Sequence, residues 1–165
     1  MQCVFSLIVD NTPGILSRIA GLFSRRNYNV DSITAGVTAD PRFTRITIAA
    51  SGDEDILEQI GKQVQKLEDV IDLKVLVPNQ SVFRELILVK VRANAAQRAE
   101  IIAVSEIFRA KVVDVEDESM TLELTGNQSK LEAFLHLLYG YEILELARTG
   151  ITGLLRGSKN VTYID

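Results

Sequence analysis

The chain carries one pattern of apolar periodicity twice, and the second copy follows the first after about 80 residues. Each copy has the order strand, helix, strand, strand, helix, strand. A unit with this order forms a four-stranded sheet with two helices on one face. The repeat therefore predicts the α+β class, with two tandem ferredoxin-like βαββαβ domains.

The first copy occupies residues 1–78. Its strands are predicted where apolar residues recur at every second position, and its helices where they recur with a 3.6-residue period. The predicted strands are 3–9, 30–38, 43–50 and 70–77. The first predicted helix follows the turn at 10–14 and runs from Ile15 to about Arg26, and the second runs from Asp53 to about Leu67.

The polar residues that follow Pro78 predict a linker at 79–82. The second domain is then expected over residues 83–165, including a C-terminal tail from Gly150. Its predicted strands are 83–93, 111–116, 119–125 and 142–148, and its predicted helices are 97–108 and 128–138.

Each copy is small and covers only one face of its sheet. A unit of roughly 75 residues lies at the low end for independent stability. Both properties favour association through sheet faces or sheet edges. We therefore expect an obligate oligomer.

Composition excludes several classes of partner. The formal net charge is −4 with both signs interspersed, whereas a nucleic-acid-binding protein usually has a concentrated basic face, so no nucleic acid is expected. The first apolar stretch is interrupted by Ser6 and stopped by Asp10, so neither a signal peptide nor a membrane span is predicted. The single cysteine, Cys3, allows no internal disulfide, and a cytoplasmic location is expected.

Residues suited to catalysis are few. His136 is the only histidine, and neither it nor Cys3 has a partner nearby in the sequence, so no catalytic residue is assigned. No cysteine or histidine cluster has the spacing of a metal site. The acidic runs at 53–55 and 114–118 are interpreted as a helix start and a hairpin tip. The sequence predicts a protein that is not an enzyme.

The turn at residues 10–14 allows two interpretations. In the first, Asn11 or Thr12 caps the helix, Pro13 fits its first turn and Gly14 allows close packing. In the second, the free amides and the positive dipole end of the helix bind a carboxylate. The turn chemistry alone leaves both open.

Several runs are similar to the ACT domain and the following domain of the acetolactate synthase (acetohydroxyacid synthase) small-subunit family. They cover most of the chain, and the longest contain the turn at 10–14. The longer runs are DNTPGILSRI at 10–19, GLFSRRNYNV at 21–30, TRITI at 44–48, LVKV at 88–91, FRAKVVDV at 108–115 and ARTG at 147–150, and shorter ones lie at 58–60, 62–63, 66–67, 84–86 and 156–157. Departures from the family pattern are Asn27 in place of glycine, Thr44 in place of serine, and 139–141 in place of a proline–phenylalanine pair.

The resemblance implies a regulatory subunit of acetolactate synthase in branched-chain amino acid biosynthesis. It would bind the catalytic large subunit, raise its activity and confer feedback inhibition by valine. Thiamine diphosphate, magnesium and FAD would belong to the large subunit, and this chain would hold no cofactor of its own. The alternative is a free-standing amino-acid-binding ACT regulator, such as a transcriptional co-regulator, without a large-subunit partner.

The resemblance also implies an effector site between the ACT domains of a homodimer. One chain would contribute the start of its first helix, and the other would contribute its second strand. The implied residues are Asn11, Pro13, Gly14, Ile15 and Leu16 from one chain and Asn29, Val30, Asp31 and Ile33 from the other.

We expect the carboxylate of valine to meet the amides of Gly14 and Ile15. Asn11 and Asn29 would orient its polar end, and Ile15 and Ile33 would pack on its side chain. Leucine and isoleucine fit an apolar wall as well, so the preferred amino acid stays open.

Overall fold

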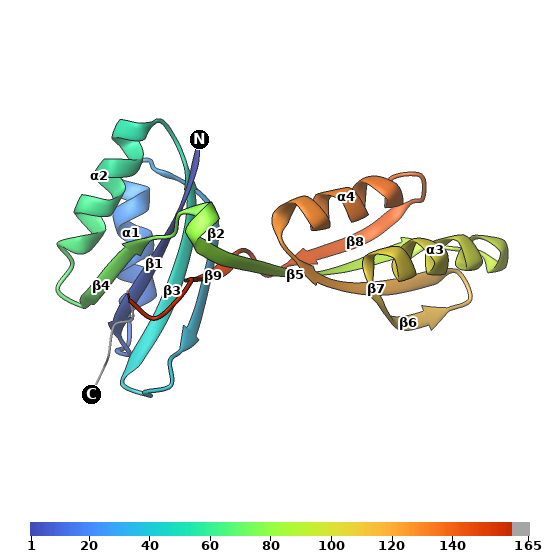
Figure 1. Ribbon diagram of the computed structural model, residues 1–165, viewed down its shortest axis with the longest axis horizontal. Helices are drawn as coiled ribbons and strands as arrows, with labels where there is room; N and C mark the ends of the chain where they lie inside the picture. The colour runs from blue at the N-terminus through green and yellow to red at the C-terminus, as the bar shows by residue number, and fades with distance from the viewer. Residues whose placement is uncertain (160–165) are drawn as a thin grey trace. The chain divides into compact units, whose positions relative to one another are not determined.

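The computed structural model describes residues 1–159 and divides into two compact units. Unit 1 is Met1–Val82 together with the chain from Gly150 onward, and unit 2 is Phe83–Thr149. The elements, labelled in Figure 1, are β1 (Gln2–Asp10), α1 (Ile15–Arg25), β2 (Asn29–Val37), β3 (Phe43–Ser51), α2 (Glu54–Gln65), β4 (Val70–Val75), η1 (Pro78–Gln80), β5 (Ser81–Arg92), α3 (Ala95–Phe108), β6 (Lys111–Glu116), β7 (Ser119–Gly126), α4 (Gln128–Leu138), β8 (Ile143–Arg148) and β9 (Thr152–Leu155).

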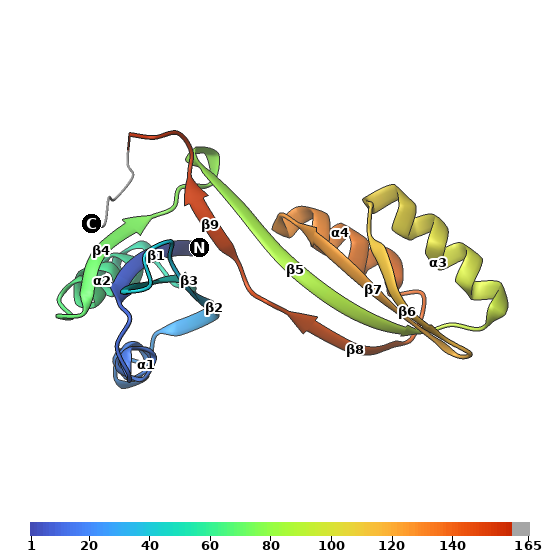
Figure 2. The same ribbon diagram turned by 90° about the horizontal axis from the view of Figure 1, so that it is seen from below.

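The sheet of unit 1 has the order β2-β3-β1-β4, and all its neighbouring strands are antiparallel. Helices α1 and α2 cover one face of it (Figures 1 and 2). This is the split βαββαβ arrangement that the sequence predicts. The core between the sheet and the helices is built from aliphatic and aromatic side chains, including Phe5, Leu7, Val9, Ile19, Phe23, Ile46, Ile48, Leu57 and Ile60.

The start of α1 differs from the prediction that Asn11 or Thr12 caps it. The cap position is taken by Gly14, whose φ is 84°, and no side chain among the described residues caps this helix. The prediction is wrong because the chain makes an extra turn before the helix begins. Only glycine adopts this left-handed conformation without steric cost.

The sheet of unit 2 has the order β6-β7-β5-β8, and α3 and α4 pack on one face of it. Its core includes Ile87, Val89, Val91, Ile101, Met120, Leu122, Leu131 and Phe134. Helix α3 begins two residues before the predicted start, because Asn94 and Gln97 form a capping box in which each side chain accepts from the other residue's amide.

The two units share local irregularities as well as their topology. Asn27 and Arg109, which follow α1 and α3 in the chain, both have left-handed conformations, with φ of 56° and 58°. A β-bulge follows in each unit, between Val30 and Ser32 in β2 and between Val112 and Asp114 in β6. These equivalent positions are all 82 residues apart. β6 in unit 2 is therefore the counterpart of β2 in unit 1.

The tail from Gly150 was expected in the second domain, but the structure places it in unit 1. Two hydrogen bonds fasten it to β2: the Ile151 amide donates to Ser32 Oγ at 3.4 Å, and Thr34 Oγ1 donates to the Ile151 carbonyl at 3.5 Å. The Arg156 amide donates to the Gln80 carbonyl at 2.8 Å. The tail thus lies on the sheet face opposite α1 and α2. Residues 160–165 of this predicted tail lie outside the described residues.

The linker expected at 79–82 also has regular structure. Pro78–Gln80 form the short 3-10 helix η1, and β5 begins directly after it at Ser81. The division between the two units falls inside this strand, after Val82.

Candidate effector-binding site

The turn before α1 presents unpaired amide groups. The Ile15 amide makes a long hydrogen bond of 3.4 Å to the Thr12 carbonyl. Within residues 1–159, the amides of Gly14, Leu16 and Ser17 have no protein acceptor. These groups lie at the positive end of the helix dipole, so together they favour a carboxylate.

Asn11 is fastened to the neighbouring hairpin instead of to the helix. Its amide group donates to the Pro41 carbonyl at 3.0 Å, and its side-chain oxygen accepts from Thr44 Oγ1 at 3.2 Å. Its backbone amide donates to the Arg42 carbonyl at 2.8 Å. Asn11 therefore holds the turn in place against the start of β3.

Arg18, in the first turn of α1, is a charged residue that the site predicted from the sequence does not include. Its guanidinium lies 2.7 Å from the Asp69 carboxylate and 3.5 Å from Thr12 Oγ1. It also borders Gly14, since a Cβ on that glycine would stand 3.3 Å from Arg18 Nη1. The only signal in the sequence is the spacing of four residues, which places Arg18 one helical turn after Gly14.

The side chain of Ile15 does not line the site. It is buried in the core of unit 1 with Ile19 and Leu22. The expectation that Ile15 packs on the ligand's side chain is therefore corrected, and only its backbone borders the turn. Leu16, the next residue, is exposed beside it.

The second predicted group, on β2, surrounds the β-bulge of that strand. The Asp31 carboxylate accepts hydrogen bonds from Gln2 Nε2 at 2.8 Å and Asn29 Nδ2 at 3.2 Å, and also from Ser51 Oγ. A bulge often redirects a side chain in this way. The carboxylate and the Asn29 amide form one polar cluster at the end of the sheet. Gln2 and Ser51 carry no sequence signal, because only the strand pairing brings them here.

An apolar groove lies between α1 and β2, with a volume of about 520 Å³. Val30 and Ile33, which are 38% and 43% exposed, form its β2 side. Ala20 and Phe23 form its α1 side. The groove can therefore receive an aliphatic side chain.

The two predicted groups lie far apart within one chain. Asn29 pairs with Ser51, which pairs with Gln2, at one end of the sheet. The Gly14 turn follows Asp10, at the other end of β1. Eight residue steps of about 3.3 Å separate the ends of β1, or about 26 Å. A small amino acid cannot reach both groups of the same chain.

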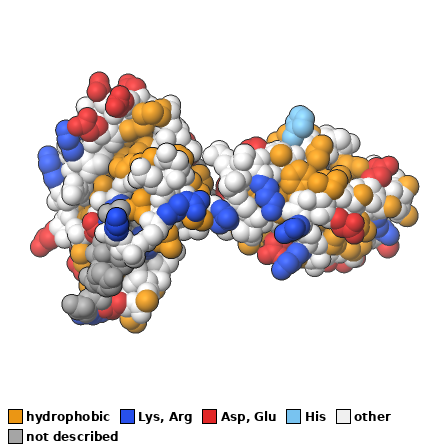
Figure 3. Space-filling view, in the orientation of Figure 1, with side chains coloured by type: hydrophobic (Ala, Val, Ile, Leu, Met, Phe, Trp, Pro, Cys, Tyr) orange, Lys and Arg blue, Asp and Glu red, His pale blue; other side chains and the backbone are white. Residues whose placement is uncertain are grey.

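Other reactive side chains do not form a site. His136 is exposed on α4 (Figure 3). Its ring lies edge-on to that of Tyr139, with the ring centroids 6.2 Å apart. Burial raises the pKa of the Cys3 thiol, which opposes thiolate formation. Among residues 1–159, no three acidic, cysteine or histidine side chains are placed to hold a metal ion. In the same range, no helix has both the length and the apolar character that a bilayer crossing requires.

Known proteins match both units. A family model described as "AHAS small subunit-like ACT domain" matches residues 5–72, and one described as "Small subunit of acetolactate synthase" matches residues 84–157.

Individual relatives match nearly the whole chain. The chain is 47% identical to a probable acetolactate synthase small subunit of Methanothermobacter thermautotrophicus, covering 96% of this chain and 95% of that protein. It is 45% identical to the acetolactate synthase small subunit of Mycolicibacterium smegmatis, covering 94% and 92%. The crystal structure of the small subunit from Thermotoga maritima superposes with a TM-score of 0.87 at 39% identity, covering 96% of this chain and 99% of that one.

Proposed function

The chain belongs to the family of acetolactate synthase small subunits, and we propose that it binds valine between two paired copies and thereby inhibits a catalytic large subunit. The observation that carries this proposal is the distance between the two groups of predicted site residues within one chain. The Gly14 turn and the Asp31 cluster lie at opposite ends of the same sheet, and Asp31 is on the exposed edge strand β2.

Pairing along β2 brings the two groups together. β2 is the outer strand of its sheet, and we propose that two copies pair along it in antiparallel fashion about a twofold axis. The Asn29 end of one β2 then lies beside the Val37 end of the other. Val37 pairs with Thr44, whose hydroxyl contacts the Gly14 turn through Asn11. Each site therefore combines the turn of one chain with the Asp31 cluster of its partner.

The chemistry of each group suits one part of an amino acid. The carboxylate accepts from the free amides of Gly14 and Leu16, while Asp31 attracts the ammonium group. The side chain packs on Val30 and Ile33, which border the groove. A charge-assisted hydrogen bond contributes about 1.5–3 kcal/mol, and burial of a valine side chain contributes about as much. After the cost of association, the expected affinity is micromolar to millimolar.

A ligand regulates only if it binds the active and the inhibited assemblies with different affinities. In the proposed assembly the reaction, with its thiamine diphosphate, magnesium and FAD, takes place on the large subunit. Valine acts by stabilising one arrangement of the paired small subunits. This chain supplies the sensor and no reacting group.

Calorimetry of the purified chain tests the site. We expect wild type to bind valine and Gly14→Asp to lose binding, because the new carboxylate lies at the same free amides as the ligand's carboxylate. Gly140→Asp is the matched control, since a Cβ there meets nothing within 4 Å in the described part of the chain. Undiminished valine binding by Gly14→Asp would overturn the assignment.

The regulatory role needs a second experiment with the large subunit present. We expect addition of this chain to raise acetolactate synthesis and to make it sensitive to valine, with Gly14→Asp retaining activation and losing sensitivity. Valine binding without any effect on the large subunit would instead support the free-standing amino-acid regulator.

A further inference from the structure

Unit 2 also has an exposed edge strand, β6. All six residues of Lys111–Glu116 are exposed, and three of them are valines. Val112, Val113 and Val115 are 38%, 50% and 50% exposed. An exposed apolar edge strand is a template for pairing with another chain, and proteins usually protect it. Figure 3 shows that hydrophobic side chains also reach the surface elsewhere on this unit.

The register of β6 assigns its side chains to two faces. Val112 and Val115 pair with Leu122 and Met120, which are core residues, so both valines lie on the helix-covered face. Lys111, Asp114 and Glu116 pair with β7 residues that alternate along that strand with its core residues. These three side chains therefore lie on the opposite face of the sheet. One face of this edge strand is therefore apolar, and the other face is charged.

We propose that β6 pairs with β6 of a second copy of this chain, antiparallel, about a twofold axis between Val113 and Asp114. In this register Lys111 stands opposite Glu116, and Val112 stands opposite Val115. Each pair has both members on the same face, as cross-strand neighbours must have. The twofold axis repeats both pairs, so these four positions of the strand are complementary to one another in charge and in polarity, while the central positions Val113 and Asp114 stand opposite each other at the β-bulge.

Helix α3 contributes an exposed apolar side chain next to the β6 edge. Arg98 on α3 donates to the carbonyl oxygens of Glu116 and Asp117, which fixes the side of the helix that faces the end of β6. Ile102, one helical turn later on the same side, is 42% exposed. Its counterpart in unit 1 is Ala20, which lines the α1–β2 groove. The larger side chain extends the apolar part of the β6 edge.

This contact is independent of the β2 pairing in the proposed function, so the experiment must separate them. The background for every measurement is the full chain with Ile33→Lys and Val37→Lys, which places four lysines along a β2 seam. Lysine on an edge strand opposes pairing. The mass of each variant is measured by sedimentation equilibrium.

We expect the background variant to remain a dimer through β6. Adding Lys111→Glu places like charges opposite each other twice and weakens dimerisation about tenfold. Adding Glu116→Lys to that variant restores the opposite charges and returns the dissociation constant to near the background value. A monomeric background variant, or a Lys111→Glu variant that dimerises as well as the background, would overturn the proposal. The proposed function would fail separately, through loss of valine binding in wild type.

A disulfide tests the register directly. Val112→Cys and Val115→Cys, in a Cys3→Ser chain, should form cross-linked dimers on mild oxidation. Cysteines three residues apart in one strand are about 10 Å apart, which exceeds the reach of a disulfide within the chain. Failure to form a cross-linked dimer would overturn the pairing.

Discussion

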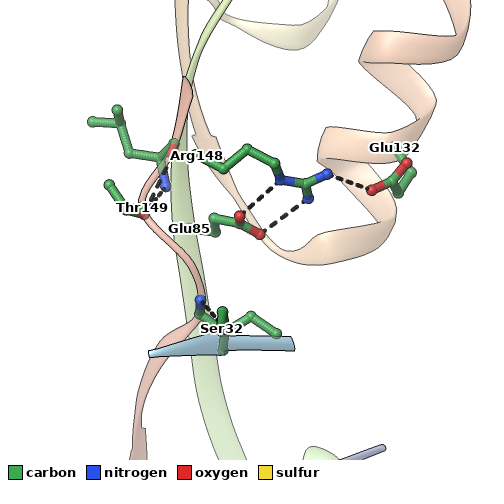
Figure 4. A network of polar contacts seen from close by, with 7 residues as sticks. Ser32, Glu85, Glu132, Arg148 and Thr149 are labelled. Carbon is green, nitrogen blue, oxygen red and sulfur yellow. Dashed lines mark hydrogen bonds and ion pairs between the residues drawn. The ribbon is translucent and has the colours of Figure 1, made fainter. Parts of the chain in front are cut away.

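Gly150 packs against Ser32 with no room for a side chain: an added Cβ would stand 2.8 Å from the Ser32 Cβ. The glycine also has a φ of 88°. Directly after it, the Ile151 amide donates to Ser32 Oγ (Figure 4). Since Ser32 follows Asp31 in β2, the C-terminal segment is fixed to the same strand that carries the candidate effector site.

We predict that Gly150→Ala lowers the free energy of unfolding by about 3 kcal/mol. A left-handed conformation costs a non-glycine residue about 1–2 kcal/mol, and the contact with Ser32 adds overpacking strain of similar size. Gly157→Ala is the control, because Gly157 has a φ of 77° but a Cβ there meets no atom of residues 1–159 within 4 Å. Urea denaturation of both variants should differ by about 1–2 kcal/mol. Equal losses of unfolding free energy in the two variants would show that a side chain at residue 150 does not clash with Ser32.

Arg148 holds a buried carboxylate in unit 2 (Figure 4). Its guanidinium contacts the Glu85 carboxylate at 2.9 and 3.2 Å and Glu132 at 3.0 Å. Glu85 is 6% exposed, and the hydrogen bonds to it raise the pKa of Arg148.

We predict that Arg148→Met lowers the free energy of unfolding by about 3 kcal/mol, because it leaves Glu85 buried without its partner. Lys90→Met, which removes the exposed pair of Lys90 with Glu145 at 3.2 Å, should cost less than about 1 kcal/mol. Urea denaturation compares the two. If Arg148→Met costs no more than Lys90→Met, the buried pair does not stabilise the fold.

The capping box of α3 should be more important for stability than Asn11 is for α1. Asn94→Ala removes the side chain that accepts from the Gln97 amide at 2.9 Å, and we predict a loss of about 1 kcal/mol. Asn127→Ala, at the cap of α4, should cost a similar amount, since Asn127 accepts from Lys130. Thermal unfolding measures both. A loss well below 0.5 kcal/mol for Asn94→Ala would contradict the role of the box.

The Cys3 thiol should react slowly and only at high pH. Burial raises its pKa above the ordinary value of 9.0. Deprotonation is therefore harder in the folded chain, and the stabilisation linked to this shift is present below pH 9 and is lost as the pH rises through the folded pKa. We predict that the alkylation rate reaches half its maximum at a higher pH than in a Cys3→Ser, Gly140→Cys control. An equal or lower midpoint would contradict burial of the thiol.

Asp31→Asn should weaken valine binding about tenfold, because the proposed site loses the charge that attracts the ammonium group. Asp117→Asn is the control, since it removes the same charge from the tip of the β6–β7 hairpin. Calorimetry measures both dissociation constants. Unchanged affinity in Asp31→Asn would place the ammonium group elsewhere.

The order of strands and helices could be predicted because apolar residues recur with one period in strands and with another in helices. It missed β9, since the short run Thr152–Leu155 becomes a strand only through contacts with residues distant in sequence. The predicted cap of α1 was wrong for a related reason. Asn11 has the chemistry of a cap, but its side chain is hydrogen-bonded to the hairpin residues Pro41 and Thr44 instead of to the helix. Burial of Ile15 likewise depends on packing that a turn motif does not encode.

Unit 2 is an insertion within unit 1, because the chain leaves unit 1 after Val82 and returns to it at Gly150. Synthesis on the ribosome proceeds from the N-terminus, and domains generally fold as they emerge. The whole of unit 2 has therefore been made before the segment that bonds to Ser32 and Thr34 exists. Until unit 2 has been translated, the sheet that carries the candidate effector site therefore lacks the C-terminal segment that covers one of its faces.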